Sequence, residues 1–464
     1  MTEIPTPRLD PGAQAPAGID RGAWSWALYE GARNPWVIVC AIYVFAPYVA
    51  TVVIGDPVEG QAQIADLNKW AGLIAAFVAP ILGAAADRAG GRKAPLALAT
   101  AIMATAMVLC WFVAPGPQAW VWFPLLLTVS GLFGLTEALH NAMLPGAAPP
   151  RLIPHVSGLG LALGNAAGVV ILVFTLVFLA FPGHVPWSFV PAAPAFGLDP
   201  KTYEPQRIVP VICGLWFAAF TIPMLLYTPD TVRGAPWLQA IRGGVASVAG
   251  TLRKLKDLGS VGRFLVARML YADAKTAIIV IGGVYVSGVM HWGLIEMTIY
   301  GIVLSILAVL GGFVGGWLDD AVGPKRAIQI EIGLTCAALV TQVSINREML
   351  FFQPMAPLKV WDAPYFATLQ ELSLMAVVCV LAVFITAAYA SSRTLMTRLS
   401  PPAIVGELFG LYALAGTATS WLGPLLVGAV TRATQSQQIG FVSLAVLLIA
   451  GFVVLLGVKA PARA

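Results

Sequence analysis

Long apolar stretches recur along the whole 464-residue chain, and about twelve of them are near 20 residues long. A helix of this length is just long enough to cross a hydrocarbon core of about 30 Å. Hydrophobic residues make up 59% of the chain and charged residues only 11%, whereas soluble domains carry about 25% charged residues. The ten-residue alternation of an outer-membrane barrel is absent from the sequence. The chain is therefore predicted to be an all-α integral membrane protein.

The composition also argues against several other classes of protein. The five cysteines stand singly in apolar stretches without C-x-x-C spacing, which is typical of small core residues and not of metal ligands or disulfide partners. The basic residues behind the net charge of +5 are scattered through loops, so nucleic acid is not an expected partner. The sequence has no phosphate-binding loop of an ATP-driven pump, no zinc-protease motif and no serine elbow. We expect a chain that is not an enzyme and needs no cofactor or metal.

The distribution of basic residues predicts how the chain crosses the membrane. If the first span starts near Ala23 from the cytoplasm, seventeen of the 27 Lys and Arg residues fall in cytoplasmic segments, six outside and four within spans. This bias follows the positive-inside rule and places both termini in the cytoplasm. Residues 1–21 are polar, rich in proline and without the apolar core of a signal peptide, so we expect a disordered cytoplasmic tail.

Three patterns recur in the same order in both halves of the chain. "GAAADRAGGRK" matches "GWLDDAVGPKR" at an offset of 233, "LYEGAR" matches "LYADAK" at an offset of 242, and residues 149–164 echo residues 401–416 at an offset of 252. Each matched pair falls on the same side of the membrane in a twelve-span arrangement. The halves are therefore predicted to be parallel repeats, each a bundle of six transmembrane helices.

The repeats define the expected domain organisation. We expect an N-terminal six-helix bundle at 22–227, a cytoplasmic connector at 228–262 and a C-terminal six-helix bundle at 263–464. The connector contains "GGVASVAGTLRKLKD", which is too polar at its end to span. Its basic residues suit an amphipathic helix lying against anionic headgroups, and a plain tethering loop is the alternative.

This arrangement resembles the major facilitator superfamily over nearly the whole chain, and the paired Asp/Gly/Arg-Lys loops are its most specific match. In that family the loop aspartate pairs with basic residues and a helix end of the opposite bundle while the transporter faces outward. The resemblance implies cytoplasmic gate loops formed by Gly83, Asp87, Arg88, Gly90, Arg92, Lys93, Gly316, Asp320, Gly323, Lys325 and Arg326. Asp319 lies beside Asp320 and could substitute for it. The alternative is that these charges only fix the topology.

A narrower resemblance is carried by "SWALYEGARNPW", "HNAMLP", "FLVARMLYADA" and "SSRTLMTRLSPPAIVGELFGLYALAGTATSWLGPLLVG". These stretches are similar to the vacuole-effluxer-like branch, whose fungal members are associated with amino-acid efflux from the vacuole. The resemblance implies a secondary transporter of a small polar solute that works by alternating access. The chain departs from that branch at His140, Tyr389 and Thr417, where members tend to carry an aromatic residue, Gln and Lys. A sugar, drug or peptide-like solute, an uncoupled facilitator and a non-transporting receptor therefore remain alternatives.

Charged residues within the predicted spans are candidates for energy coupling, because a charge there costs at least ~2.5 kcal/mol. Tyr29 and Arg33 are four residues apart on one helix face, and Glu30 is within reach of Arg33 at i+3. Tyr271 and Lys275 repeat this pattern in the second half. A carboxylate that binds a proton in one conformation and pairs with a cation in another can couple protons to transport, and a static ion pair is the alternative. The coupling candidates are Glu30, Asp273, Arg33 and Lys275.

Other polar residues within spans are candidates for solute binding. Glu137, His140 and Asn141 share one helix face, and Arg393 aligns with Asn141 at the offset of 252. An arginine at that place would bind a carboxylate or phosphate group through two parallel hydrogen bonds, and a structural ion pair is the alternative. The candidates for this site are Tyr29, Tyr271, Glu137, His140, Asn141, Tyr389, Arg393, Tyr412 and Thr417. We expect a monomer in the inner or plasma membrane whose partners are a small-molecule solute, protons and membrane lipids.

Overall fold

The computed structural model describes residues 19–117, 119–149, 151–230, 234, 259–400 and 405–459. The first half contains α1 (Arg21–Pro35), η1 (Trp36–Tyr43), α2 (Phe45–Tyr48), η2 (Val49–Val53), α3 (Pro57–Ala89), α4 (Lys93–Leu109), η3 (Cys110–Phe112), η4 (Ala119–Val121), α5 (Trp122–Ala147), α6 (Ile153–Phe174), η5 (Thr175–Ala180), η6 (Ala195–Gly197), η7 (Pro200–Thr202) and α7 (Glu204–Tyr227). The second half contains α9 (Gly259–Met290), α10 (Leu294–Val322), α11 (Pro324–Val343), β1 (Met349–Leu350), β2 (Gln353–Pro354), α12 (Leu369–Leu399), α13 (Val405–Thr417), α14 (Leu422–Thr434), α15 (Gln437–Val442) and α16 (Leu444–Leu456).

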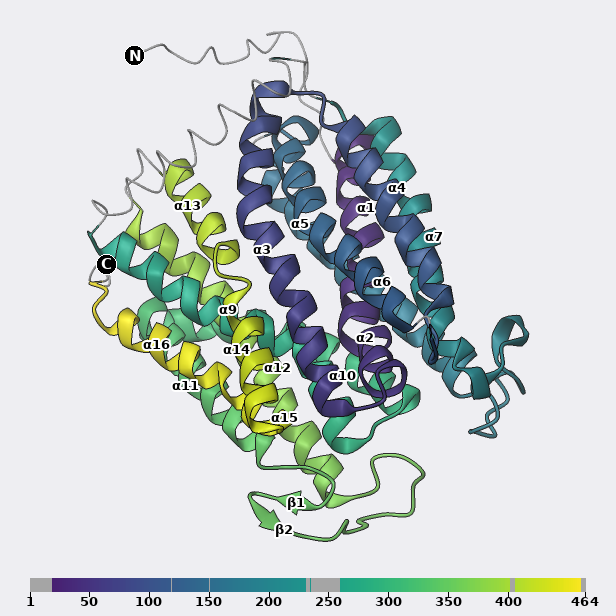
Figure 1. Cartoon of the computed structure of the whole chain (residues 1–464). Helices are drawn as coiled ribbons and strands as arrows, with labels where there is room; N and C mark the ends of the chain where they lie inside the picture. Colours follow the sequence, from purple (N-terminus) through teal and green to yellow (C-terminus); the bar gives the residue numbers. More distant parts are fainter. Residues whose placement is uncertain are drawn as a thin grey trace.

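The helices have the length and composition of membrane spans. Within the described ranges, nine helical segments are long and apolar enough to cross a membrane. Three further helices, α3, α9 and α11, are 33, 32 and 20 residues long, so twelve helical segments in the described part of the chain are long enough to span. Figure 1 shows these helices packed side by side. The prediction of an all-α membrane fold is confirmed.

The helices form two groups. In the N-terminal group, α1 packs against α6 and α7, and α4 packs against α5 and α7. In the C-terminal group, α10 and α11 pack against α12, and α9 packs against α16. The groups meet along α3 and α14, and Figure 1 shows them lying farther apart toward the end where α1 begins and α13 lies. We name the opposite end, where the hairpin β1–β2 lies, the hairpin side.

Glycines end the helices at the two repeated loops. Gly90 follows α3 with φ of 61° and Gly323 lies between α10 and α11 with φ of 83°, both in the left-handed region that favours glycine. The extra glycine of the first loop, Gly91, has φ of 60°. The sequence-based prediction of a tight turn after each aspartate is confirmed.

Small residues let helices approach closely, as "GGWL" predicts. A Cβ added to Gly315 of α10 would lie 2.8 Å from the carbonyl oxygen of Ala387 in α12. Between the two groups, a Cβ added to Gly72 of α3 would lie 2.7 Å from the carbonyl oxygen of Ser420, in the turn between α13 and α14. Both contacts need a residue without a side chain.

The domain boundaries remain predictions. Most of the expected connector, 228–262, lies outside the described residues, and so does most of the expected tail, 1–21. At the described edges, α1 begins at Arg21 and is capped by Asp20, whose carboxylate accepts a hydrogen bond from the Ala23 backbone at 2.8 Å. The helix α9 begins at Gly259, within the range expected for the connector.

Candidate functional site

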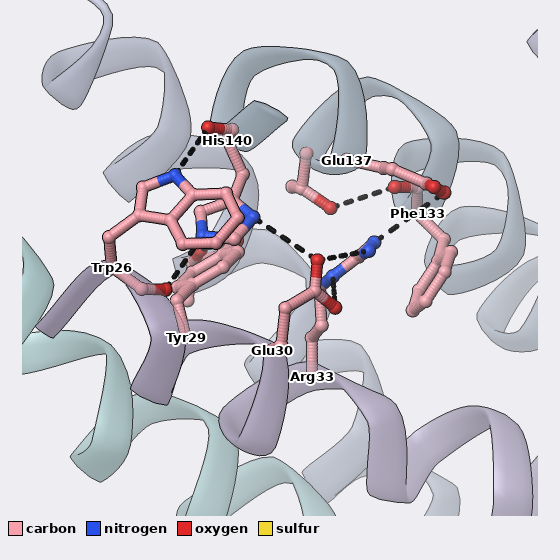
Figure 2. Close-up of polar contacts among 9 residues, drawn as sticks. Trp26, Tyr29, Glu30, Arg33, Phe133, Glu137 and His140 are labelled. Atoms are coloured by element: carbon pink, nitrogen blue, oxygen red, sulfur yellow. Dashed lines mark hydrogen bonds and ion pairs between the residues drawn. The ribbon is translucent and has the colours of Figure 1, made fainter. Parts of the chain in front are cut away.

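A cluster of charged residues joins α1 to α5 (Figure 2). The Arg33 side chain donates two hydrogen bonds of 3.0 Å to the Glu30 carboxylate, as the i+3 spacing predicts. Its Nη1 lies 3.6 Å from Oε2 of Glu137 on the neighbouring helix. The Phe133 ring covers the Arg33 guanidinium at 4.6 Å, so a nearly buried cation lies between two carboxylates.

His140 extends this cluster on the other side of Glu30. Its ring stacks on the Trp26 indole with 4.2 Å between the ring centroids, and its Nε2 lies 2.8 Å from the Trp26 carbonyl oxygen. Its Nδ1 lies 3.3 Å from Oε1 of Glu30. In return, the Trp26 indole N–H donates to the His140 carbonyl at 2.8 Å. Helix α5 is thus held against α1 by a reciprocal pair of bonds, and these fix the imidazole facing Glu30.

This geometry determines where a proton can lie. A carbonyl oxygen only accepts hydrogen bonds, so Nε2 of His140 must carry a hydrogen for its bond to Trp26. The neutral imidazole would then present its Nδ1 lone pair to the Glu30 carboxylate at 3.3 Å, which is repulsive. A proton on either Nδ1 or Glu30 removes the repulsion. With that proton bound at either place, the charges of Glu30, Arg33, Glu137 and His140 sum to zero.

The corresponding cation of the second half has a different environment. Lys275 of α9 is completely buried, and its Nζ lies 3.7 Å from the centroid of the Tyr389 ring. It forms no ion pair with a described residue, and its hydrogen bond to the Ile385 carbonyl is long, at 3.4 Å. Tyr271 contacts Ser392 at 2.7 Å, whereas its counterpart Tyr29 contacts Thr100 at 3.2 Å. Tyr271 and Lys275 of the second half therefore have different contacts from Tyr29 and Arg33 of the first half.

Asp273 contacts a break in a helix. The chain turns between the end of α13 at Thr417 and the start of α14 at Leu422, and Oδ2 of Asp273 accepts a 2.8 Å hydrogen bond from the Gly423 backbone N–H. This carboxylate thereby caps α14, where a negative charge is favourable. It is 1% exposed, and its Oδ1 accepts no hydrogen bond from the described residues. The sequence analysis did not predict this break.

The other solute-site candidates are mostly on exposed surface. Glu137, Asn141, Arg393 and Thr417 are exposed, and Arg393 pairs with no carboxylate among the described residues. Tyr412 is buried beneath Arg268, whose guanidinium lies 3.6 Å above the centre of its ring. Arg268 was not among the predicted site residues.

The basic residues of the repeated loops contact helix ends of their own half. Nζ of Lys93 donates to the Leu225 carbonyl in the last turn of α7 at 2.8 Å, and Nζ of Lys325 donates to the Leu456 carbonyl at the end of α16 at 3.0 Å. A cation at a helix C-terminus stabilises the helix dipole. The Arg92 side chain likewise donates to the Ala142 carbonyl of α5.

The acidic residues of these loops are placed differently. Asp320 is exposed, as are Gly316 and Arg326, whereas the neighbouring Asp319 is 5% exposed and its Oδ1 accepts no hydrogen bond from the described residues. The side chains of Asp87 and Arg88, together with Gly83, lie outside the described part of the structure. The pairing predicted for Asp87 therefore remains a prediction.

A polar contact between α3 and the C-terminal group closes the hairpin side. Gln61 is fully buried, and its Nε2 donates to Oγ1 of Thr431 at 2.9 Å and to the Gln437 carbonyl at 3.0 Å. Close by, Asp66 forms an ion pair with Arg432. We name these five residues the α3–α14 contact. The sequence analysis did not predict this contact, although neutral polar residues such as Gln61 within an apolar helix could have indicated a buried hydrogen bond.

Glu331 of α11 is a second buried carboxylate that sequence reasoning missed. It is completely buried, and Ser391 donates to its Oε1 at 2.9 Å. Its position within the apolar run "AIQIEIGLTC" could have marked it.

Comparison with known proteins identifies the family. The family model described as "Vacuole effluxer Atg22 like" matches residues 151–462, about two thirds of the chain. The chain belongs to this family. The predicted resemblance to the vacuole-effluxer-like branch is confirmed.

Individual relatives agree with this assignment. The chain is 23% identical over 439 residues to YxiO of Bacillus subtilis, described as an uncharacterized MFS-type transporter, with 93% of each chain covered. It is 24% identical over 320 residues to autophagy-related protein 22 of Yarrowia lipolytica and 25% identical over 315 residues to autophagy-related protein 22-2 of Emericella nidulans. These matches cover 64% of the chain but only 48% and 50% of the fungal proteins, so the chain spans about half their length.

Solved structures share the fold. The nucleoside transporter NupG aligns with a TM-score of 0.60 at 12% identity, covering 95% of this chain and 99% of that one. The D-xylose-proton symporter aligns with a TM-score of 0.60 at 12% identity, covering 93% and 96%. A bacterial homolog of the human lysosomal transporter Spinster, in an inward-facing and occupied conformation, aligns with a TM-score of 0.59 at 14% identity, covering 95% and 98%. The chain is a membrane transporter with the major facilitator fold, and not an enzyme.

Proposed function

We propose that this chain is a proton-coupled secondary transporter that moves a small polar solute, an amino acid or a similar metabolite, by alternating access. The observation that carries the proposal is the contact between Glu30 and His140. The bond from Nε2 of His140 to Trp26 leaves Nδ1 and the Glu30 carboxylate 3.3 Å apart, where one shared proton is favourable. This pair is the proposed proton site.

Arg33 would link the proton site to the solute. It bridges Glu30, which is nearly buried, and Glu137, whose side chain is 48% exposed. A solute amino group that binds Glu137 would compete with Arg33 for that carboxylate. Arg33 would then pair with Glu30 alone. The Arg33 guanidinium would compete with the proton for the Glu30 carboxylate and so favour release of the proton from the Glu30–His140 pair. The exposed Arg393 is the proposed partner for a carboxylate on the solute.

Alternating access would require the two helix groups to separate on the hairpin side. In this structure the α3–α14 contact holds them together there, while they lie farther apart toward the end where α13 lies (Figure 1). We propose that both termini face the cytoplasm of an inner or plasma membrane, that this conformation is inward-facing, that the repeated loops are the cytoplasmic gates and that the transporter is a monomer. Asp273 and Lys275, which are both buried in the C-terminal group, are the remaining coupling candidates.

The test is uptake by proteoliposomes that contain the purified protein. Labelled amino acids and a mixed panel of metabolites are offered with and without an imposed pH gradient. Stimulation of one solute class by the gradient supports the proposal and identifies the solute. Flux that is indifferent to the gradient would indicate an uncoupled facilitator or another coupling ion, and no flux of any offered solute would contradict the proposed solute class.

His140→Phe is the variant that isolates the proton site. Phenylalanine keeps an aromatic ring against Trp26 but has no nitrogen to share a proton with Glu30. The proposal expects solute exchange to continue and the stimulation by a pH gradient to be lost. Gradient stimulation that survives in His140→Phe would remove the Glu30–His140 pair from the coupling role.

A further inference from the structure

Exposed large apolar side chains gather in the loop between α11 and α12, which contains the hairpin β1–β2. They are Phe351, Phe352, Met355, Leu358, Val360 and Trp361. This loop lies beyond the helix ends on the hairpin side (Figure 1). Exposed apolar side chains that gather outside the spans mark a contact with a membrane or with another protein. The proposed function assigns no role to this loop.

The tip of the hairpin has a strained backbone. Leu350 of β1 pairs with Gln353 of β2, so Phe351 and Phe352 are the two residues of the turn. Their φ angles are 51° and 63°, and a type I′ turn has positive φ at both of these places. Such turns favour Asn-Gly, because bulky side chains are rarely found in the left-handed region. The hairpin thus presents two exposed phenylalanines where smaller residues would fit with less strain.

A backbone contact fixes the depth of this tip. The Phe352 N–H donates to the Ser344 carbonyl at 3.1 Å, one residue beyond the end of α11 at Val343. Helix α11 is 20 residues long, which corresponds to about 30 Å, the thickness of a hydrocarbon core. Its other end carries Lys325 and Arg326, which belong at the opposite membrane surface. The tip therefore lies at the level where the acyl chains meet the headgroups.

The tip also continues a face of α11 that is turned to lipid. Exposed apolar residues recur along this helix every three or four positions, at Ile330, Leu334, Ala337 and Val340. In a membrane-spanning helix such an exposed stripe contacts acyl chains. The next position in this series is Ser344, whose carbonyl accepts the bond from the hairpin tip. The two phenylalanines therefore follow directly after a surface that contacts lipid.

We propose that the tip of the hairpin β1–β2 is a membrane anchor, in which Phe351 and Phe352 insert between the phospholipid headgroups on the hairpin side. Aromatic side chains are favoured at the boundary of headgroups and acyl chains, and removing their rings from water offsets the strain of the turn. The depth of the tip and its continuity with the lipid-facing side of α11 favour lipid over a protein partner. The anchor holds this end of the C-terminal group at a fixed depth, whichever solute or ion is transported.

The test places a fluorescent label at the tip and measures what surrounds it in phospholipid nanodiscs. Phe351→Cys carries the label after replacement of the five native cysteines, which are free thiols. Asp362→Cys is the matched control, because Asp362 is in the same loop and its side chain is 98% exposed. A phospholipid with a nitroxide on its acyl chain serves as the lipid quencher, and iodide serves as the aqueous quencher.

The label at the tip should be quenched several times more strongly than the control by the nitroxide lipid and several times less strongly by iodide. Equal quenching at the two positions would overturn the proposal. Protection of the tip from both quenchers would also overturn it, because the tip would then be covered by protein and not by lipid.

A second label position covers the case that a label in the turn distorts the hairpin. Gln353→Cys places the label on β2 beside the tip and leaves both phenylalanines in place. Phe351→Asn and Phe352→Gly are then introduced together in this protein, because Asn-Gly is the favoured pair for such a turn. The hairpin is kept while the aromatic rings are lost, so quenching by the nitroxide lipid should fall several-fold. Undiminished quenching would contradict the assignment of the two phenylalanines.

Discussion

Replacing Gln61 with Leu is expected to open the hairpin side of the transporter. Gln61 is buried, and its amide makes hydrogen bonds of 2.9 Å to Thr431, 3.0 Å to the Gln437 carbonyl and 3.3 Å to the Gln437 side chain. Leucine fills the same space but cannot make these bonds. In the closed state Thr431 and Gln437 would then stay buried without their partner, whereas in an open state water would hydrate them.

The size of the effect follows from the cost of such unpaired groups. Leaving a buried polar group without a partner costs about 1–3 kcal/mol. The ratio of closed to open molecules should therefore fall by roughly five- to 150-fold, since about 1.4 kcal/mol corresponds to a factor of ten. The lower end of this range applies if water enters the closed contact.

The assay measures the separation of the two helix groups by pulsed electron spin resonance. Nitroxide labels are placed at Lys201 and Ile439, which are exposed residues of the two groups, after replacement of the five native cysteines. The expected result is a second, longer distance whose population rises in Gln61→Leu. Lys359→Ala is the matched control, because its ion pair with Asp362 is exposed and lies within one loop. Identical distance distributions for Gln61→Leu and the control would refute the reasoning.

Two further predictions concern contacts between the two helix groups. Arg432→Ala removes ion pairs to Asp66 and Glu59. Because the Arg432 side chain is 40% exposed, solvent screening limits the lost stability of the closed state to about 0.5–1 kcal/mol. The ratio of closed to open molecules should then fall about two- to fivefold in the same distance measurement. An effect larger than that of Gln61→Leu would show that charge and not buried hydrogen bonding holds the contact. Gly283→Ala would place a Cβ in steric clash with the Ile42 carbonyl oxygen of the other group. The closed state should therefore be lost and transport should fall more than tenfold. Gly333 has open space around it, so the control variant Gly333→Ala should retain transport. Equal transport by the two alanine variants would contradict this packing.

The sequence predicted the parts of this protein that depend on local pattern. Helical spans follow from the length of the apolar runs, and the turns at Gly90 and Gly323 follow from glycines that tolerate positive φ. The bond between Glu30 and Arg33 follows from their i+3 spacing on one helix. These features need no knowledge of which helices become neighbours.

The parts that the sequence did not predict depend on packing between distant segments. Glu30 and His140 were separate candidates, because no spacing rule brings residues 110 apart into contact. The capping of α14 by Asp273 depends on a helix break that the "GTATSWLG" stretch marks only weakly. Gln61 was overlooked because a neutral side chain shows its role only once its partner in the other group is known.

The measurement that most directly tests the central claim is solute-driven proton movement into proteoliposomes, followed with a pH-sensitive dye inside the vesicles. The account predicts that adding the transported solute acidifies or alkalinises the lumen with the unchanged protein and with the control Glu348→Gln, an exposed loop variant. With Glu30→Gln the pH signal should vanish while solute exchange continues. Proton movement that is undiminished in Glu30→Gln would contradict the account.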